Sequence, residues 1–316
     1  MAVPNVGDAI VHSLRLVNKT LEDNVTNHST VLRMLKKNKS VKVATGGRVI
    51  DETLNYGLNN SVQWFENYDT FTPPTTGQEV VDFAEFPWKQ LGGFISLSGR
   101  EQKINSGEYK RIDFIESRKT NLIANLQNSF AQSVFSDGTA FAGKELTGLL
   151  AGVPDNPAVG TYGGINRASF SFWRSKVSAA VPTTAANISS RMNAMYLAII
   201  RGDDKPNLIV AGDTMYRYYW ESLQSIQRIT SSDSADQGYP ELAFNGAKVC
   251  FDSYCSSSRM YFLNTRNLFL RTFEKEIFEI GDARTVTNAD YKVIPVFSMC
   301  NLTTNRAAAH GVLLAS

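Results

Sequence analysis

One apolar stripe constrains the fold more than any other feature, because it predicts a single helix that is unusually long for a compact enzyme. The stripe consists of five residues that recur at spacings of three, four and seven: Ile112, Ile115, Leu122, Leu126 and Phe130. These spacings place all five on one face of an α-helix. Ser106 can cap the helix, and Glu108 in its first turn favours the helix dipole. The stripe runs toward Gly138, so we expect roughly 30 residues and a length of about 45 Å.

Shorter patterns beyond this helix predict both helices and strands. Residues 138–164 are rich in Gly and Pro and are expected to be irregular. A second helix ends at Gly202 and carries five apolar residues on one face: Ile188, Met192, Met195, Tyr196 and Ile199. Residues 208–211 form a short buried strand. Asp213 then caps a third helix with an apolar side made of Met215, Tyr219, Leu223 and Ile226.

The last quarter of the chain is mostly strand. Asn245-Gly246 is a strong signal for a tight hairpin between strands at 242–244 and 247–251. Further strands are expected at 260–263, 268–273 and 291–297. The mixture of helices and strands indicates an α+β fold.

An aromatic hairpin is predicted before the long helix. Residues 64–71 and 79–86 form its two arms, and the Pro-containing stretch 72–77 forms the turn. Its aromatic residues are too numerous for a lone hairpin to bury: Trp64, Phe65, Tyr68, Phe71, Phe83 and Phe86. We therefore expect this hairpin to pack on something else.

The first 100 residues divide into two segments of opposite charge. Residues 1–47 are polar, with seven basic and three acidic residues, a net of +4, and are predicted to be an arm. Residues 48–100 carry three basic and seven acidic residues, a net of −4. The arm holds a basic cluster: Arg33, Lys36, Lys37, Lys39 and Lys42. This basic cluster could contact DNA nonspecifically, but the charge complementarity favours acidic protein surface.

No pattern predicts a catalytic, cofactor or metal site. The three cysteines, Cys250, Cys255 and Cys300, have no metal-ligand spacing with the histidines and are expected to be reduced. Gly138 to Lys144 resembles a phosphate-binding loop, but Glu145 stands where Ser or Thr is needed. The chain lacks the G-x-S-x-G motif.

Other polar residues and the N-terminus have ordinary interpretations as well. We interpret His310 as an ordinary surface or packing residue, and Asp203-Asp204 as a solvated turn. The N-terminus lacks the features of a secretion signal, and no apolar run approaches membrane-spanning length.

The segment Tyr162-Gly163-Gly164-Ile165-Asn166-Arg167, followed by Trp173-Arg174, is predicted to be a firmly anchored bend. Gly163 and Gly164 would shape the turn, and Arg167 and Trp173 would anchor it. This order of residues resembles the segment after the long helix in major capsid proteins of tailed bacteriophages, the family with the Hong Kong 97 fold. The likeness covers nearly the whole chain in order, and it continues through residues 208–229, 244–246, 250–252, 260–265 and 301–306.

The resemblance implies an α+β capsid fold with four parts. These are an N-terminal arm at 1–47, an extended β-hairpin loop at 48–100, a peripheral domain with the spine helix at 101–180 and 265–298, and an axial domain at 181–264 and 299–316. The implied role is a major capsid protein that forms hexamers and pentamers. These close into an icosahedral or prolate head around double-stranded DNA.

The resemblance also implies partners and a location. The expected partners are further copies of the chain, a separate scaffold protein, a portal, and decoration proteins. The arm and the hairpin aromatics would contact neighbouring subunits. Removal of residues 1–40 should leave soluble subunits or capsomers that fail to close into shells. The expected location is the virion capsid, after assembly in the host cytoplasm. Relatives crosslink a hairpin lysine, but Lys89 lies beyond the expected tip, so no crosslink is predicted.

Three alternatives remain at this point. An encapsulin-type compartment has the same fold but loads enzymes instead of a genome. A β-rich surface binding protein would suit the aromatics, although the absent secretion signal opposes it. A hydrolase is opposed by the missing nucleophile motif.

Overall fold

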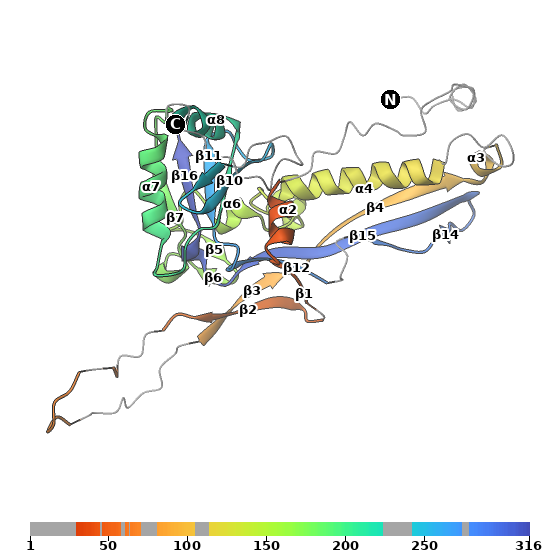
Figure 1. Cartoon of the computed structure of the whole chain (residues 1–316). Coiled ribbons are helices and arrows are strands. Elements are labelled where there is room, and N and C mark those ends of the chain that lie inside the picture. Colours follow the sequence, from red (N-terminus) through yellow and green to blue (C-terminus); the bar gives the residue numbers. More distant parts are fainter. Residues whose placement is uncertain are drawn as a thin grey trace.

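The computed structural model describes residues 30–44, 46–57, 61–62, 64–70, 81–104, 114–223, 242–273 and 278–316. The molecule has a globular body, a long extension that contains one helix and two long strands, and a thin ribbon that projects from the body in another direction (Figure 1). The described residues form two six-stranded sheets and two separate two-stranded sheets. The fold is therefore α+β, as predicted.

The first six-stranded sheet runs from the body into the extension. Its strands are β1 (Val41–Val43), β4 (Lys89–Ser98), β12 (Leu268–Thr272), β13 (Glu279–Ile280), β14 (Arg284–Thr285) and β15 (Tyr291–Thr304). Strand β15 is the centre of this sheet, since β12, β13, β14 and β4 all pair with it. Strands β4 and β15 are antiparallel over their whole shared length, from Ser98 opposite Tyr291 to Lys89 opposite Cys300. A short helix, α3 (Gly99–Ile104), follows β4.

Helix α4 (Phe114–Ser133) lies along β4 on one face of this sheet (Figure 1). It approaches closely because β4 carries a glycine beneath it: a Cβ at Gly93 would lie 2.6 Å from Leu122 Cδ1. Leu126 and Phe130 are buried as predicted. The described helix has 20 residues, about 30 Å at ~1.5 Å per residue. It ends at Ser133, before the predicted stop, and Ser106, Glu108 and Ile112 lie outside the described residues.

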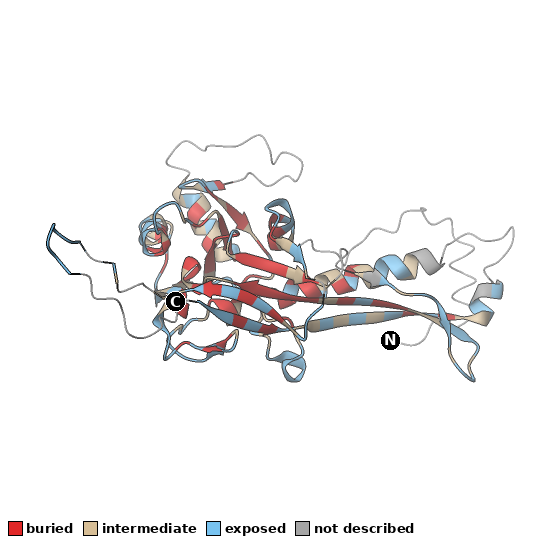
Figure 2. Cartoon of the chain, turned by 90° about the horizontal axis from the view of Figure 1, so that it is seen from below, coloured by how far each residue is buried: buried red, intermediate tan, exposed pale blue. Residues whose placement is uncertain are grey.

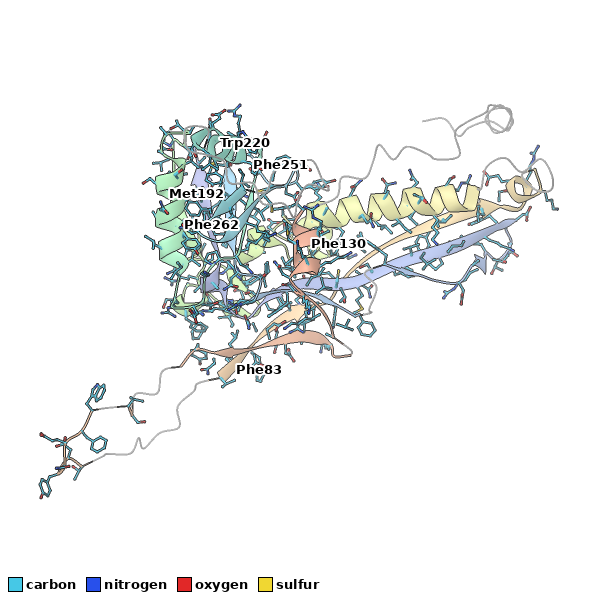
Figure 3. The ribbon with its side chains drawn as sticks, viewed as in Figure 1. Phe83, Phe130, Met192, Trp220, Phe251 and Phe262 are labelled. Atoms are coloured by element: carbon cyan, nitrogen blue, oxygen red, sulfur yellow. The ribbon has the colours of Figure 1, made fainter. Side chains whose placement is uncertain are left out.

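The second six-stranded sheet lies in the globular body. Its strands in spatial order are β7 (Lys176–Val181), β16 (Gly311–Ala315), β11 (Arg259–Leu263), β8 (Leu208–Ala211), β10 (Ala247–Phe251) and β9 (Leu242–Phe244). Helices α7 (Ile188–Ile199) and α8 (Asp213–Ser222) pack with it. The predicted apolar stripe of α7 is confirmed, because all five of its members are buried. Met192 and Phe262 lie in the core between α7 and this sheet (Figure 3).

Two local predictions about this sheet have different outcomes. The hairpin between β9 and β10 is confirmed: Asn245 and Gly246 have φ angles of 49° and 83°, as a tight turn of this type requires. The cap of α8 is corrected, since Gly212 is the N-cap and Asp213 is the first helical residue. A side chain at position 212 has no room, because a Cβ there would lie 2.2 Å from Ser256 O. Ile226 lies outside the described residues.

The ribbon consists of β2 (Val49–Asn55) paired antiparallel with β3 (Val81–Pro87). This corrects the predicted hairpin, because its first strand is 49–55, whereas the described residues of 64–71 contain no strand. Ile50, Glu52 and Leu54 alternate as buried residues along β2. The acidic Glu52 on the buried face interrupted the apolar alternation by which a strand is recognised.

Residues 30–44 belong to the folded body, although the sequence predicts an arm there. They form α2 (Thr30–Lys37) and β1, which pairs in parallel with β12. Val31, Met34 and Leu35 share one helical face and are buried in the same core as Phe130. Arg33 and Lys36 point outward and are exposed. The helix was missed because eight residues give too short a pattern to separate from a polar arm.

Sheet membership also differs in places from the expected domain ranges. Strand β4 belongs to the first sheet, although residues 48–100 were expected to form the hairpin loop. Strand β7 belongs to the second sheet, and residues 299–304 of β15 belong to the first. Figure 2 shows buried residues concentrated in the body, with exposed residues toward the end of the extension.

Candidate interaction surfaces

The predicted bend is a small β-hairpin that supports the root of the ribbon. Strands β5 (Thr161–Tyr162) and β6 (Ile165–Asn166) are joined by Gly163 and Gly164, with φ angles of 57° and 76°. The Glu85 backbone N–H of β3 donates a hydrogen bond to Gly163 O at 3.0 Å. A Cβ on Gly163 would lie 2.9 Å from Phe86 Cζ. Only glycine therefore allows β3 to approach the turn this closely.

Arg167 and Trp173 anchor this hairpin through hydrogen bonds to helix α6 and to the hairpin backbone. Arg167 is 3% exposed, and its Nη2 donates to Ala151 O at 2.7 Å and Gly152 O at 2.9 Å. Both carbonyls belong to α6 (Leu149–Gly152), so the guanidinium caps the C-terminal end of a helix. Burial lowers the pKa of Arg167. Trp173 Nε1 donates to Tyr162 O at 2.8 Å.

A buried ion pair fastens the ribbon to the first sheet. Arg271 of β12 donates from Nε to Glu52 Oε1 at 2.7 Å and from Nη2 to Glu52 Oε2 at 2.8 Å. Thr303 Oγ1 of β15 adds a third hydrogen bond to Glu52 Oε1 at 2.8 Å. Glu52 is 4% exposed. This bidentate geometry fixes the angle of β2 against two strands of the sheet.

The ribbon aromatics divide into an exposed set and a buried residue. Trp64 is fully exposed, Tyr68 is 99% exposed, and Phe65 is largely exposed, all in the described part of the loop beyond the ribbon. Phe83 is also exposed, on the ribbon itself (Figure 3). Phe86 instead packs within the chain, with its ring 5.1 Å from that of Tyr162. Phe71 lies outside the described residues.

The basic cluster lies on α2 and β1 and in the turn between them. All five side chains are exposed: Arg33, Lys36, Lys37, Lys39 and Lys42. Lys42 Nζ lies 4.0 Å above the centre of the Phe269 ring, which holds one ammonium group against the sheet. The structure thus brings the predicted cluster together on one short helix and the strand that follows it.

The phosphate-loop candidate does not have the required context. Residues 140–143 form a single turn, α5 (Ala140–Gly143), which follows α4 and not a strand. Among the described residues, no group of three or more His, Cys, Asp or Glu could hold a metal ion. No described helix combines the length and apolar character needed to cross a bilayer.

His310 is a packing residue, whereas Asp204 corrects the solvated-turn interpretation. The His310 ring is buried between the Asn264 backbone N–H, 3.3 Å from Nδ1, and Thr304 Oγ1, 3.1 Å from Nε2. Burial lowers the pKa of His310 to about 4. Asp204 accepts hydrogen bonds from Asn264 Nδ2 at 2.6 Å and from Arg306. Asp204 therefore joins a polar network, while Asp203 is exposed.

All three cysteines are buried, and none of them takes part in a disulfide. Burial raises the pKa of Cys255 to about 12 and that of Cys300 to about 11. Thiols with such values are almost fully protonated near neutral pH and are poor nucleophiles.

Two exposed aromatic features were missed by the sequence reasoning. Phe94 of β4 and Phe297 of β15 are both exposed, and their rings meet edge to face at 5.9 Å between centres. The exposure of Phe94 could have been predicted from the sequence. In a strand, Phe94 lies on the face opposite Ile95 and Leu97, which are buried. The second feature is Phe141, which is 81% exposed in α5.

The whole fold matches solved structures of shell-forming proteins along nearly its full length. The capsid of cyanophage A-1(L) matches with a TM-score of 0.68 and 16% identity, covering 95% of this chain and 96% of the other. The capsid of Myoviridae phage XM1 matches with a TM-score of 0.59 and 14% identity, covering 96% and 98%. A holo encapsulin complex from Synechococcus elongatus PCC 7942 matches with a TM-score of 0.60 and 10% identity, covering 99% and 96%.

At the sequence level, no protein-family model and no curated protein matches the chain. The structural likeness nevertheless defines the fold: this chain has the Hong Kong 97-type capsid fold. The sequence-based resemblance to tailed-phage major capsid proteins is thereby confirmed at the level of the fold.

Proposed function

We propose that this chain is the major capsid protein of a tailed bacteriophage. In this proposal, it assembles into hexamers and pentamers that close into an icosahedral or prolate head around double-stranded DNA. One observation carries the proposal: phage capsid subunits match this chain over at least 95% of both lengths. The match therefore extends over the chain as a whole and is not confined to one sheet or one domain. The role is structural, and no catalytic step is assigned.

The exposed aromatics of the loop beyond the ribbon support contacts between copies. Exposed aromatic clusters on a soluble subunit mark interaction sites, and Trp64 and Tyr68 have almost all of their surface exposed. We infer that this loop packs on a neighbouring subunit, while the Glu52 to Arg271 pair holds the ribbon at a fixed angle. The basic cluster on α2 and β1 then provides positive charge either for acidic surface of a neighbour or for nonspecific contact with packaged DNA.

The remaining partners follow from the same proposal. A separate scaffold protein, a portal and decoration proteins would take part in assembly, which would occur in the host cytoplasm and end in the virion head. We infer these partners from the proposed class of shell. The proposed function requires no cofactor or metal.

Electron microscopy of the purified full chain, with an assay of its nucleic-acid content, tests the proposal. We expect closed shells, or capsomers that close when a scaffold is supplied, and particles from the producing host that contain double-stranded DNA. A chain that stays monomeric at high concentration in every condition would refute the shell role.

The encapsulin alternative stays open because the encapsulin complex also matches over 99% of this chain. The same experiment separates the two functions. Closed shells that contain a protein cargo and no genome would favour the encapsulin compartment, whereas double-stranded DNA inside would favour the capsid.

A paired substitution tests the aromatic loop separately. Replacing Trp64 and Tyr68 with Ser should leave the Tm of the monomer within about 1–2 °C, since exposed positions contribute little to folding. Assembly should weaken at least about tenfold in the concentration required. Normal assembly of this variant would refute the contact between the loop and a neighbouring subunit, and the proposed shell function would still stand.

A further inference from the structure

Phe141 stands out because an unfavourable backbone conformation presents an exposed ring. Phe141 and Ala142 have φ angles of 52° and 57°, and the next residue, Gly143, has 77°. Left-handed backbone is routine for glycine but unfavourable for residues that carry a Cβ, above all bulky ones. Yet the Phe141 side chain is 81% exposed. The ring therefore gains little burial within its own chain that could offset the unfavourable backbone.

The turn is held in place from both sides. Gly143 N donates to Thr139 O at 3.0 Å, and Asp137 Oδ1 accepts from Thr139 N at 3.0 Å. Lys89 Nζ, at the start of β4, donates to Gly143 O. These hydrogen bonds keep the backbone of residues 137–143 in one conformation and the Phe141 ring outward.

The segment after the turn is anchored in the core beside the root of the ribbon. Asn301 Oδ1 accepts from Thr147 N at 3.1 Å, and Asn301 Nδ2 donates to Pro87 O at 2.8 Å. Asn301 is fully buried. Gly148 fits against α4, where a Cβ would lie 2.4 Å from Ser133 O. The Phe141 turn is thus a rigid projection from the core and not a loose loop tip.

We propose that Phe141 is an assembly contact that inserts its ring into an apolar site on a second copy of this chain. The inference rests on the proposed shell function, in which each copy is surrounded by others. Strained backbone persists where the surrounding structure enforces it and is concentrated at binding sites. An aromatic ring on a rigid support is also the kind of anchor that dominates protein interfaces, because little entropy is lost when it binds.

A second copy is the occupant that fits these observations best. The ring is apolar, and the exposed residues on either side of it are the small Ala140 and Ala142. The ring and its two small neighbours present apolar atoms, which suit a protein pocket better than a phosphate backbone. This surface also lies beside the root of the ribbon, through Lys89 and the Asn301 to Pro87 bond. The ribbon is the element whose outer loop the proposed function already assigns to contacts between copies.

Two glycine substitutions separate the contact from the backbone strain. Phe141→Gly removes both the ring and the strain, whereas Ala142→Gly removes strain at the next residue and keeps the ring. We expect both variants to fold, with the Tm of the monomer unchanged or higher by about 1–3 °C. Only Phe141→Gly should assemble poorly, with the protein concentration for half-assembly raised about tenfold or more.

The outcomes decide between the proposals. If the wild type forms shells and Phe141→Gly forms them at the same concentration, the Phe141 contact is refuted while the shell function stands. If the wild type forms no shells, both fall. A lowered Tm for the Phe141→Gly monomer would show that the ring serves its own chain, and would also contradict the inference.

Photocrosslinking gives an independent measurement on assembled wild-type-like shells. A benzophenone amino acid at position 141 should produce covalent dimers on irradiation, and mass spectrometry should locate the partner peptide on a second copy. Crosslinks that form only within one chain would overturn the proposal.

Discussion

At the scale of single residues, Glu52 shows how one buried charge orients a whole element. Its carboxylate accepts hydrogen bonds from Nε and Nη2 of Arg271 and from the Thr303 hydroxyl. Removing one partner of such a pair leaves the other charge buried and uncompensated, which costs more than the intact pair contributes. We therefore expect Glu52→Gln to lower the free energy of unfolding of the monomer by about 2–4 kcal/mol, measured by chemical denaturation.

The Glu101 to Arg118 pair supplies the control for Glu52. It has the same chemistry at 2.8 Å, but its side chains are 46% and 39% exposed. Water and salt screen such a pair, so Glu101→Gln should cost less than about 1 kcal/mol. Equal losses for the two variants would contradict the assigned role of burial.

His310 makes the stability of the chain depend on pH. Its folded pKa is about 4, against an ordinary value of 6.5, because burial disfavours the charged ring. The stabilising contribution of the neutral ring is complete above pH 6.5 and is lost as the pH falls toward 4, since only the unfolded chain then binds the proton. The full loss is about 3 kcal/mol.

Denaturation midpoints between pH 7 and pH 5 test this dependence. The wild type should lose stability over this range, and His310→Gln should show a flatter profile from a lower starting value. The interval ends at pH 5 to keep carboxylate titration small. If the stability of His310→Gln falls with pH as steeply as that of the wild type, groups other than His310 cause the pH dependence.

At the scale of elements, the β5–β6 hairpin supports the ribbon through Gly163, where a side chain would crowd β3. Gly163 and Gly164 both have positive φ, so alanine at either position should cost about 1–2 kcal/mol. Only at Gly163 would the new Cβ meet other atoms, 2.9 Å from Phe86 Cζ and 3.1 Å from Ala84 Cβ. We expect Gly163→Ala to be less stable than Gly164→Ala by about 1–3 kcal/mol.

Thermal unfolding of the two variants measures that difference directly. Gly164 is the matched control, because a Cβ there would meet nothing within 4 Å. Equal Tm values would show that β3 moves aside without cost, and the hairpin would then not fix the position of the ribbon.

At the scale of the whole molecule, the sequence predicts what short-range patterns determine and fails where distant segments decide. The α7 stripe and the Asn245-Gly246 turn were located from a few neighbouring residues, and both are confirmed. The strand that pairs with β3 was misplaced by about 15 residues. Its inward Glu52 is compensated only by Arg271, 219 positions away, and no local pattern could show that partner.

The interaction surfaces follow the same distinction. Gly163 and Arg167 were predicted to shape and anchor a bend from the residues next to them in the sequence. Phe141 was missed because its conformation and exposure depend on hydrogen bonds with Lys89 and on the fit of the following segment against α4 and β15. Exposure is a property of the folded chain, so an isolated phenylalanine in sequence resembles any core residue.

The position of α2 changes what a deletion at the N-terminus would test. Removing residues 1–40 takes away Val31, Met34 and Leu35, which are buried in the core with Phe130. It also removes the Ser40 hydroxyl, which donates to Thr265 O at 2.8 Å. Losing three buried apolar side chains costs roughly 6 kcal/mol or more, a large part of the stability of a typical domain. This deletion should therefore unfold the subunit, not leave the soluble subunits first expected.

A deletion that stops before Thr30 separates folding from assembly. Removing residues 1–29 keeps the three core residues and Ser40, so the monomer should retain a cooperative thermal transition close to that of the full chain. Removing residues 1–40 should abolish the transition or lower its Tm by more than about 10 °C. If the two deletions unfold at the same temperature, α2 contributes nothing to the core. If the shorter deletion folds but its shells fail to close, the first 29 residues act in assembly, and their role can be measured without loss of the fold.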